Sequence, residues 1–126
     1  YAEVLLTYAE AQNEASGPDQ SVYDAINQLR RRPDINMPEV PKGLTKDQMR
    51  EVIRRERRIE LTFEGLYYSD ILRWKTAEKE NNGMMHNYDG IEVVKRSFNP
   101  KRDYLWPIPY NQTVLNPNLE QNPNWD

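Results

Sequence analysis

The sequence predicts a mostly α-helical fold, in which helices form pairs and an irregular, proline-rich C-terminal segment packs on them. Apolar residues recur at helical spacing in four stretches of the first 80 positions, and turn residues separate these stretches. Five of the nine prolines lie from Pro100 onward, where the helical spacing is lost. We therefore expect helices over about residues 1–15, 21–32, 45–64 and 67–80 and a loop-rich tail over 84–126, in one domain spanning residues 1–126.

The first helix carries apolar residues on more than one side. Leu6 points away from a stripe that, at about 100° per residue, collects Tyr1, Val4, Leu5, Tyr8, Ala11 and Ala15. We expect such a helix to be packed by neighbours on both sides, as in stacked helix pairs. Because helical spacing starts at Tyr1 with neither Met nor an N-cap before it, we also expect the chain to be part of a longer protein.

The second helix is predicted from the turn signals around it. A small residue, a glycine and a proline break the pattern over residues 16–19, and Ser21 is the expected N-cap, with Asp24 three positions later. The helix is expected to end near Arg32, because Pro33 disfavours helical geometry in the residue before it. The first two helices should therefore form a hairpin.

Residues 33–43 hold three prolines and a glycine, which predicts a surface connector. A capping box from Thr45 to Gln48 then starts the third helix, and Gly65 is placed to stop it. The fourth helix is expected to break at residues 81–83.

The tail combines β-forming and apolar residues with prolines. Residues 91–94 predict a short strand, and one short strand pair in the tail is compatible with this pattern. A disordered tail would not carry so many apolar side chains, so we expect these residues to pack against helices: Phe98, Tyr104, Leu105, Trp106, Ile108, Leu115 and Leu119.

Composition excludes several classes of function. Basic and acidic side chains number 17 and 20, so the formal charge of −3 predicts no attraction to nucleic acid or to an anionic membrane. The chain has no cysteine, which excludes disulfides, thiolate catalysis and sulfur-ligated metals. No apolar run reaches the ~20 residues of a bilayer span, no signal peptide opens the chain, and no motif predicts a cofactor.

The third helix is unusually charged. From residue 46 to residue 64 it has six cations and five anions that alternate, which disfavours a nucleic-acid patch. Glu56 and Glu60 nevertheless lie within the apolar stripe that contains Met49. A buried carboxylate is costly unless it is paired, so we predict a structural polar network of these two residues with Arg57 and Arg73, or with a tyrosine hydroxyl.

A catalytic interpretation of Glu56 and Glu60 is weaker. Helical neighbours four residues apart have the spacing of glycosidase carboxyls, but catalytic carboxyls flank an open cleft and these point into a helix seam. We therefore assign no catalytic residue. A metal site is not expected either, because the Glu-x-x-His partner motif of di-metal bundles is missing and His86 is the one histidine.

Aromatic residues are the other candidates for a binding site, because ligands such as sugars stack on exposed tryptophan and tyrosine faces. Tyr1, Tyr8, Tyr67 and Trp74 lie on helical stripes, where core packing is the better interpretation. More open positions in the loops are held by Tyr88, Tyr110 and Trp125. No pattern brings these into one site, so no ligand-binding residue is predicted.

Four blocks, in order and nearly end to end, resemble the SusD/RagB family. They are residues 1–14, residues 25–30, the run 53–65 continued by Tyr68 and residues 70–74, and a closing motif over residues 104–109 and 116–123. The resemblance implies the C-terminal part of a surface-exposed outer-membrane lipoprotein of Bacteroidota-type bacteria, built on tetratricopeptide-like helix pairs. Such proteins capture oligosaccharides or glycan-derived peptides beside a TonB-dependent transporter and are not enzymes.

Two features of the family are missing from this chain: the lipid-anchored cysteine with its signal peptide, and the upstream half that supplies much of the sugar-binding surface. We therefore expect the ligand-binding residues to lie largely upstream and the membrane to be reached only through that anchor. A helical-repeat adaptor that binds protein without binding glycan is the alternative, and glycoside hydrolysis is the weakest of the three hypotheses.

Overall fold

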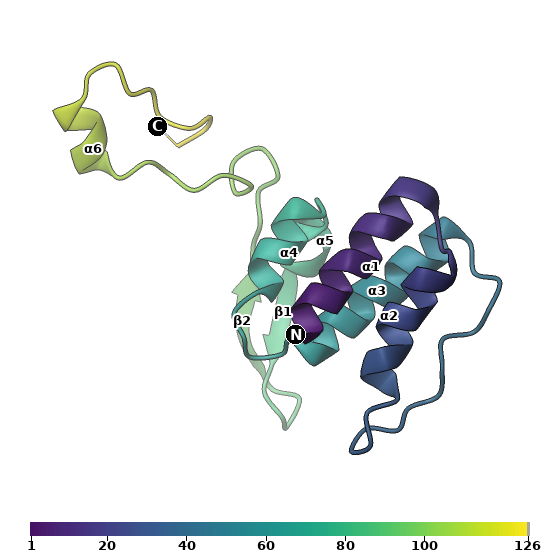
Figure 1. The fold of residues 1–126 in the computed structure, drawn as a ribbon. Helices are drawn as coiled ribbons and strands as arrows, with labels where there is room; N and C mark the ends of the chain where they lie inside the picture. Colours follow the sequence, from purple (N-terminus) through teal and green to yellow (C-terminus); the bar gives the residue numbers. More distant parts are fainter. Residues whose placement is uncertain (126) are drawn as a thin grey trace. The chain divides into compact units, whose positions relative to one another are not determined.

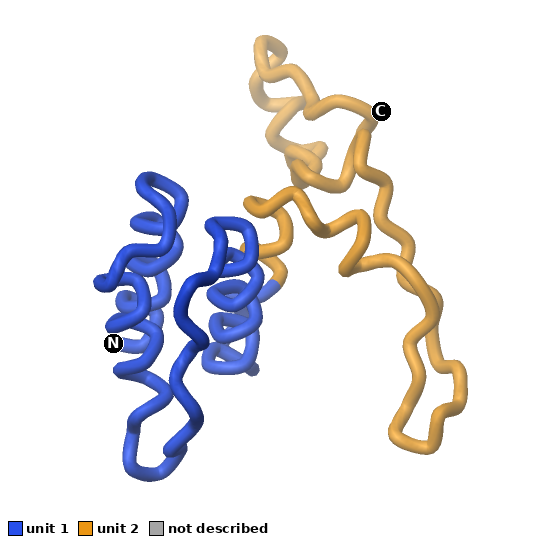
Figure 2. The backbone as a smooth tube through the Cα atoms, turned by 90° about the vertical axis from the view of Figure 1, so that its right-hand side faces the viewer, with its two compact units in different colours: residues 1–67 blue, residues 68–126 orange. Residues whose placement is uncertain are grey.

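The computed structural model describes residues 1–125. The chain divides into two compact units, residues 1–67 and residues 68–126 (Figure 2). The first unit contains helices α1 (Ala2–Ser16), α2 (Gln20–Arg30) and α3 (Lys46–Glu60) (Figure 1). Helix α4 (Tyr67–Arg73) begins at the last residue of that unit. The second unit continues with α5 (Ala77–Glu80), strands β1 (Gly83–His86) and β2 (Glu92–Arg96), and α6 (Tyr110–Leu115). The prediction of a mostly helical fold with one strand pair is confirmed.

Helices α1 and α2 form the predicted hairpin, but the N-cap of α2 is Asp19 and not Ser21. The Asp19 carboxylate accepts hydrogen bonds from the backbone N–H of Ser21 and Val22, at 2.9 and 3.2 Å. A charged acceptor at a helix N-terminus satisfies free N–H groups and interacts favourably with the helix dipole, so the helix starts one residue earlier than predicted. Gly17 closes α1 with a φ of 85°, a conformation that glycine adopts without strain.

The core of the first unit lies between its three helices. Helix α1 contributes Ala9 to this core, and its Leu6 and Asn13 are also fully buried. This corrects the predicted stripe, because Tyr1 and Val4 are 81% and 66% exposed. Both faces of α1 are apolar, and the sequence pattern alone did not distinguish the face that α2 and α3 cover. The core is completed by residues of α2, the connector and α3: Val22, Tyr23, Ala25, Ile26, Val40, Met49 and Ile53.

The connector between α2 and α3 is fastened by side chains of α2. The backbone N–H of the buried Val40 donates to Asn27 Oδ1 at 2.9 Å, and the N–H of Leu44 donates to the Tyr23 hydroxyl at 3.1 Å. Helix α2 itself ends at Arg30, two residues before the predicted end. A proline disfavours helical geometry only in the residue before it. Pro33 therefore defines how far α2 can extend, but it does not determine at which earlier residue the helix ends.

The predicted capping box of α3 is confirmed. The Thr45 hydroxyl accepts from the backbone N–H of Gln48, and the Gln48 side chain accepts from the backbone N–H of Thr45 at 2.9 Å. These two bonds satisfy N–H groups that a helix start otherwise leaves to water.

We expect Thr45→Ala to lower the free energy of unfolding by about 1 kcal/mol, because the exposed N-terminus of α3 loses one side-chain acceptor. Urea unfolding followed by circular dichroism measures the change. Thr45→Ser keeps the hydroxyl and is the matched control. A Thr45→Ala protein as stable as the Thr45→Ser protein would contradict the role of this cap.

Helix α3 ends at Glu60, four residues before the predicted end. The Thr62 hydroxyl donates to the carbonyl oxygens of Arg58 and Ile59, at 2.7 and 2.8 Å, and Phe63 takes a left-handed φ of 69°. A side chain that bonds the last carbonyls competes with continuation of the helix. Phe63, which the helix predicted over residues 45–64 included, is therefore outside α3 and fully exposed.

In the second unit, the single helix predicted over residues 67–80 is divided into α4 and α5. Lys75 has a φ of 57°, the N–H of Thr76 donates to Ile71 O, and the N–H of Lys75 donates to Leu72 O. This is the hydrogen-bond pattern of a Schellman cap, which usually has glycine at the left-handed position. Here a lysine occupies the left-handed position, so the sequence contained no glycine from which the end of α4 could be predicted.

Strands β1 and β2 form an antiparallel hairpin, with Met84 opposite Lys95 and an irregularity between Met85 and His86. Every strand residue is exposed. The tail of this unit packs partly: the buried Phe98 ring contacts Tyr104 edge to face, with 4.9 Å between ring centroids. Other apolar tail residues are open to solvent, among them Leu105 and Leu115 at 52% and 77% exposure.

None of the helices described in residues 1–125 combines the length and the hydropathy that crossing a bilayer requires.

Candidate functional site

The predicted carboxylates of α3 are paired with arginines of the α2 end. Glu56 Oε2 accepts from Nε and Nη2 of Arg30, at 3.1 and 2.9 Å. The two side chains are only 13% and 17% exposed, so water screens this pair weakly. Arg30 also donates to the carbonyl oxygen of Pro38 at 2.9 Å, so one guanidinium ties together α2, the connector and α3.

Glu60 makes a second, more open pair. Its Oε2 accepts from Arg32 Nη2 at 2.6 Å, and the Arg32 side chain is 42% exposed. Sequence reasoning missed both arginine partners. The signal was the run of three arginines before Pro33, but only the path of the connector shows that this run meets the end of α3.

Arg57 and Arg73, the other two residues predicted for the network, have partners of their own. Arg57 is 5% exposed and donates to the Thr7 hydroxyl at 3.1 Å, with Glu3 at 3.7 Å. In the second unit, Arg73 Nε donates to Asp70 Oδ1 at 2.9 Å. Arg57 thus joins α3 to α1, whereas Arg73 pairs with Asp70 within its own short helix.

The buried face of α3 is rotated relative to the prediction. Met49, Ile53 and Arg57 are buried, whereas Ile59 is 61% exposed. Arg50 and Arg57 of α3 meet the acidic side of α1, which carries Glu3, Glu10 and Glu14. Opposite charges on facing helices therefore helped to set the rotation, and apolar periodicity does not contain that information.

A third ionic contact joins the other ends of α1 and α3. Arg50 Nη2 donates to Glu14 Oε2 at 2.7 Å, and Lys46 Nζ lies 3.8 Å from the same oxygen. The hydrogen bond from Arg50 is the main cause of a Glu14 pKa below its ordinary value of 4.5.

We expect this contact to make stability depend on acidity. Because the folded-state pKa of Glu14 is lowered, its contribution is present above the ordinary pKa of 4.5 and is lost as the pH falls through the lower folded pKa. Glu14→Gln should therefore lose stability at pH 6 and should lose less on acidification to pH 3. Unfolding midpoints at both pH values measure this difference. Equal acid sensitivity of the two proteins would contradict it.

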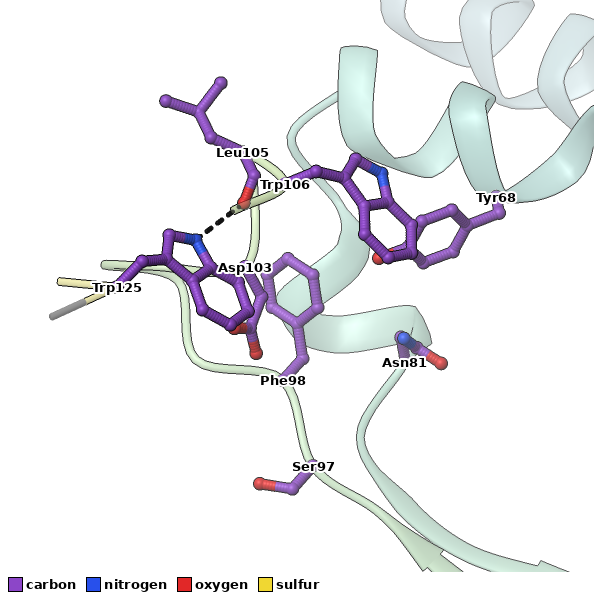
Figure 3. A pocket seen from close by; sticks show the side chains of 8 residues that line it. All are labelled: Tyr68, Asn81, Ser97, Phe98, Asp103, Leu105, Trp106 and Trp125. Atoms are coloured by element: carbon purple, nitrogen blue, oxygen red, sulfur yellow. Dashed lines mark hydrogen bonds between the residues drawn. The ribbon is translucent and has the colours of Figure 1, made fainter. Parts of the chain in front are cut away.

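An open hollow in the second unit gathers aromatic side chains (Figure 3). Its residues, named here the aromatic hollow, are Tyr68, Asn81, Ser97, Phe98, Asp103, Leu105, Trp106 and Trp125. Tyr68 and Trp106 meet edge to face at 5.9 Å between centroids, and the Trp125 indole N–H donates to Leu105 O at 2.9 Å. The guanidinium of Arg102 covers the Trp125 ring at 4.4 Å.

The charged member of the aromatic hollow, Asp103, is a carboxylate held in place. Asp103 accepts from Arg102 Nε at 2.6 Å and from the N–H of Asn99 at 2.7 Å. The hydrogen bond from Arg102 lowers the pKa of Asp103, so this carboxylate stays charged at neutral pH. A sugar ring can stack on an aromatic face while a fixed polar group beside that face bonds its hydroxyls.

The size of the aromatic hollow limits what it can hold. Its volume is about 120 Å³, below the ~300–1,000 Å³ of pockets that bury a small-molecule ligand. The aromatic hollow can therefore contact part of a ligand, but it is too small to enclose an oligosaccharide. Trp125 belongs to it, whereas the other two open aromatics, Tyr88 and Tyr110, are 98% and 82% exposed.

No group of three or more histidine, cysteine, aspartate or glutamate side chains suited to a metal ion occurs within the described residues 1–125. Glu56 and Glu60 each accept from an arginine and lie between helices. The two ion pairs join α3 to the end of α2 and to the start of the connector.

Comparison with known proteins supports the family resemblance. A profile of the SusD family matches residues 1–125. SusD-like protein P2 from Formosa agariphila is 36% identical over 127 residues, covering 97% of this chain and 24% of the relative. A SusD-like carbohydrate binding protein from Bacteroides fragilis is 37% identical with a TM-score of 0.84, covering 95% of this chain and 28% of that one.

A SusD homolog from Bacteroides thetaiotaomicron is also similar, with 35% identity, a TM-score of 0.77 and coverage of 99% of this chain and 26% of that one. The chain therefore spans about a quarter of the length of these relatives.

Proposed function

This chain belongs to the SusD family, and on that premise we propose that it is the C-terminal domain of a glycan-binding outer-membrane lipoprotein. The whole protein captures oligosaccharide at the cell surface and works with a TonB-dependent transporter that imports it. The family match over residues 1–125 is the observation that carries this proposal.

Two observations favour binding over catalysis. A structural relative at 37% identity is described as a carbohydrate binding protein. In this chain, the closely spaced carboxylates Glu56 and Glu60 are engaged by Arg30 and Arg32 and do not flank an open cleft. A retaining or inverting glycosidase needs two carboxyls that both reach the scissile bond.

The domain contributes mainly scaffold to the proposed protein. Its aromatic hollow is too small to enclose an oligosaccharide, and the ion pairs of the first unit join helices to one another. The remaining three quarters of the family length supplies the larger share of the glycan site and the lipid anchor.

Isothermal titration calorimetry of a full-length protein that contains this chain, against a panel of plant and host oligosaccharides, tests the proposal. We expect saturable binding of at least one glycan, and chromatography of the same samples should find the glycan intact. Release of shortened products would contradict binding without catalysis. An absence of binding across the panel would contradict glycan capture and favour a protein-binding adaptor.

The transporter partnership needs a separate measurement. Affinity purification of the tagged full-length protein from detergent-extracted outer membranes should recover a TonB-dependent transporter. The matched control is the same protein with its lipid-anchoring cysteine replaced by serine, which removes the protein from the membrane. Equal recovery of unrelated outer-membrane proteins would contradict a specific partnership.

A further inference from the structure

The aromatic hollow contains a tryptophan that is held at the surface. Trp106 is 70% exposed, although a large aromatic ring gains free energy when it is buried. Its ring meets Tyr68 at an interplanar angle of 65°, so the two rings do not stack (Figure 3). An edge-to-face pair occupies at most one face of each ring, and Trp106 therefore keeps a flat apolar face for a ligand.

Side chains near the end of the tail hold the segment around Trp106 in place. Asn122 Nδ2 donates to the carbonyl oxygen of Trp106 at 2.7 Å, and the Gln121 amide bonds both the N–H and the carbonyl oxygen of Ile108, each at 2.8 Å. Residues 104–108 contain neither helix nor strand, so these bonds fix a backbone that would otherwise be free to move. A segment that is already ordered loses little conformational entropy when it binds a ligand.

Trp125 supplies a second ring whose orientation is fixed. Its indole N–H bonds the carbonyl oxygen of Leu105, and the guanidinium of Arg102 lies over the ring at 4.4 Å from the centroid. Arg102 is not among the residues that line the hollow, so it covers the face that points away from the hollow. The other face of Trp125 therefore lines the hollow together with Trp106 (Figure 3).

Asp103 supplies the charged contact of the hollow. Its side chain is 15% exposed, and each carboxylate oxygen accepts one hydrogen bond, Oδ1 from Arg102 Nε and Oδ2 from the N–H of Asn99. A carboxylate offers about four acceptor positions, so about two remain for donors from a ligand. Hydroxyl groups are such donors, whereas a second carboxylate beside Asp103 would be repelled.

We propose that the aromatic hollow is a subsite for one neutral sugar ring, which packs on Trp106 and Trp125 and donates a hydroxyl hydrogen bond to Asp103. A sugar ring combines an apolar face with hydroxyl groups at its edge, and the hollow has a partner for each. Its volume of about 120 Å³ suits a single ring that lies partly in solvent. The inference rests on the proposed function, because glycan capture supplies the class of ligand.

Fluorine NMR of a full-length protein that contains this chain, labelled with 5-fluorotryptophan, tests the inference. This chain has three tryptophans, and replacing each by phenylalanine assigns its resonance. The ligand is the neutral oligosaccharide that binds in the calorimetric panel. We expect saturable shifts of the Trp106 and Trp125 resonances. Trp74 belongs to the same unit but does not line the hollow, so its resonance should stay in place.

Calorimetry of substituted full-length proteins measures what the hollow contributes to affinity. Trp106→Ala should raise the Kd for this oligosaccharide about fivefold, because one aromatic contact is lost. Tyr110→Ala is the matched control, since it removes an aromatic side chain of the same tail that is 82% exposed and outside the hollow. Its Kd should equal that of the unsubstituted protein. The fluorine measurement needs neither alanine variant, so it stands even where Trp106→Ala fails to fold.

The remaining outcomes separate this inference from the proposed function. Calorimetric binding that leaves the Trp106 and Trp125 resonances unmoved overturns the subsite and leaves glycan capture intact. Shifts of all three resonances, including Trp74, indicate a general conformational change and also overturn the subsite. A uronic-acid oligosaccharide that shifts Trp106 as strongly as the neutral one overturns the selection of a neutral ring. Absence of binding by every glycan overturns the proposed function and the inference together.

Discussion

Leu6→Ala is expected to lower the free energy of unfolding of the 126-residue chain by about 3 kcal/mol. Leu6 is fully buried in α1, among the largest fully buried side chains of the chain. Truncation of such a residue removes apolar burial and leaves a cavity, which together cost about 2–5 kcal/mol. Urea unfolding followed by circular dichroism at 222 nm measures the loss.

Val4→Ala is the matched control, because it shortens an apolar side chain on the same helix that is 66% exposed. Its effect should lie within about 0.5 kcal/mol of zero, since alanine also favours the helix slightly more than valine does. The sequence alone predicted neighbours on both apolar sides of α1, the side with Val4 and the side with Leu6, and so it did not rank the two substitutions. A larger loss for Val4→Ala than for Leu6→Ala would contradict the structure.

The two apolar faces of α1 show what periodicity can and cannot predict. Apolar spacing predicted the existence of α1, α2 and α3 and most of their starts, because each depends on local residues such as the capping box at Thr45. It could not rank the two apolar faces of α1. That choice depends on which neighbours are present, and neighbours are a tertiary property.

Helix ends were less predictable for a related reason. The end of α3 depends on the Thr62 hydroxyl and the break after α4 on a left-handed Lys75, and neither residue is a usual stop signal. At Lys75 the tertiary contact is visible: its ammonium lies 4.2 Å from the centroid of the Tyr104 ring. A cation over an aromatic ring offsets part of the cost of a strained backbone, and no local pattern reports it.

The sequence predicted that the candidate site is an ionic network, but it did not identify the arginines that take part in it. Inward-facing carboxylates on a charged helix require cations, and the sequence therefore predicted an ionic network containing Glu56 and Glu60. It could not identify Arg30 and Arg32, because an irregular connector of more than ten residues separates them from α3. The aromatic hollow was missed for the same reason: Tyr68, Trp106 and Trp125 come from segments far apart in the chain.

Glu56→Ala should have the larger effect of the two carboxylate substitutions, with a loss of about 3 kcal/mol in the free energy of unfolding, at the lower end of the range for breaking a buried ion pair. It leaves Nε and Nη2 of Arg30 without their acceptor at a position only 17% exposed. Glu60→Ala should cost about 1 kcal/mol, because its partner Arg32 is 42% exposed and water can solvate it.

A double-mutant cycle separates the pair from the cost of an orphaned charge. Arg30→Met combined with Glu56→Ala removes both charges, so the double variant should be more stable than the sum of the single losses predicts, by at least about 1 kcal/mol. Arg30 also donates to Pro38 O, so Arg30→Met carries a further loss that the cycle subtracts. Strictly additive losses would mean that Glu56 and Arg30 do not stabilise one another. The network would then owe its stability to the buried Arg57 and its contact with Thr7 of α1.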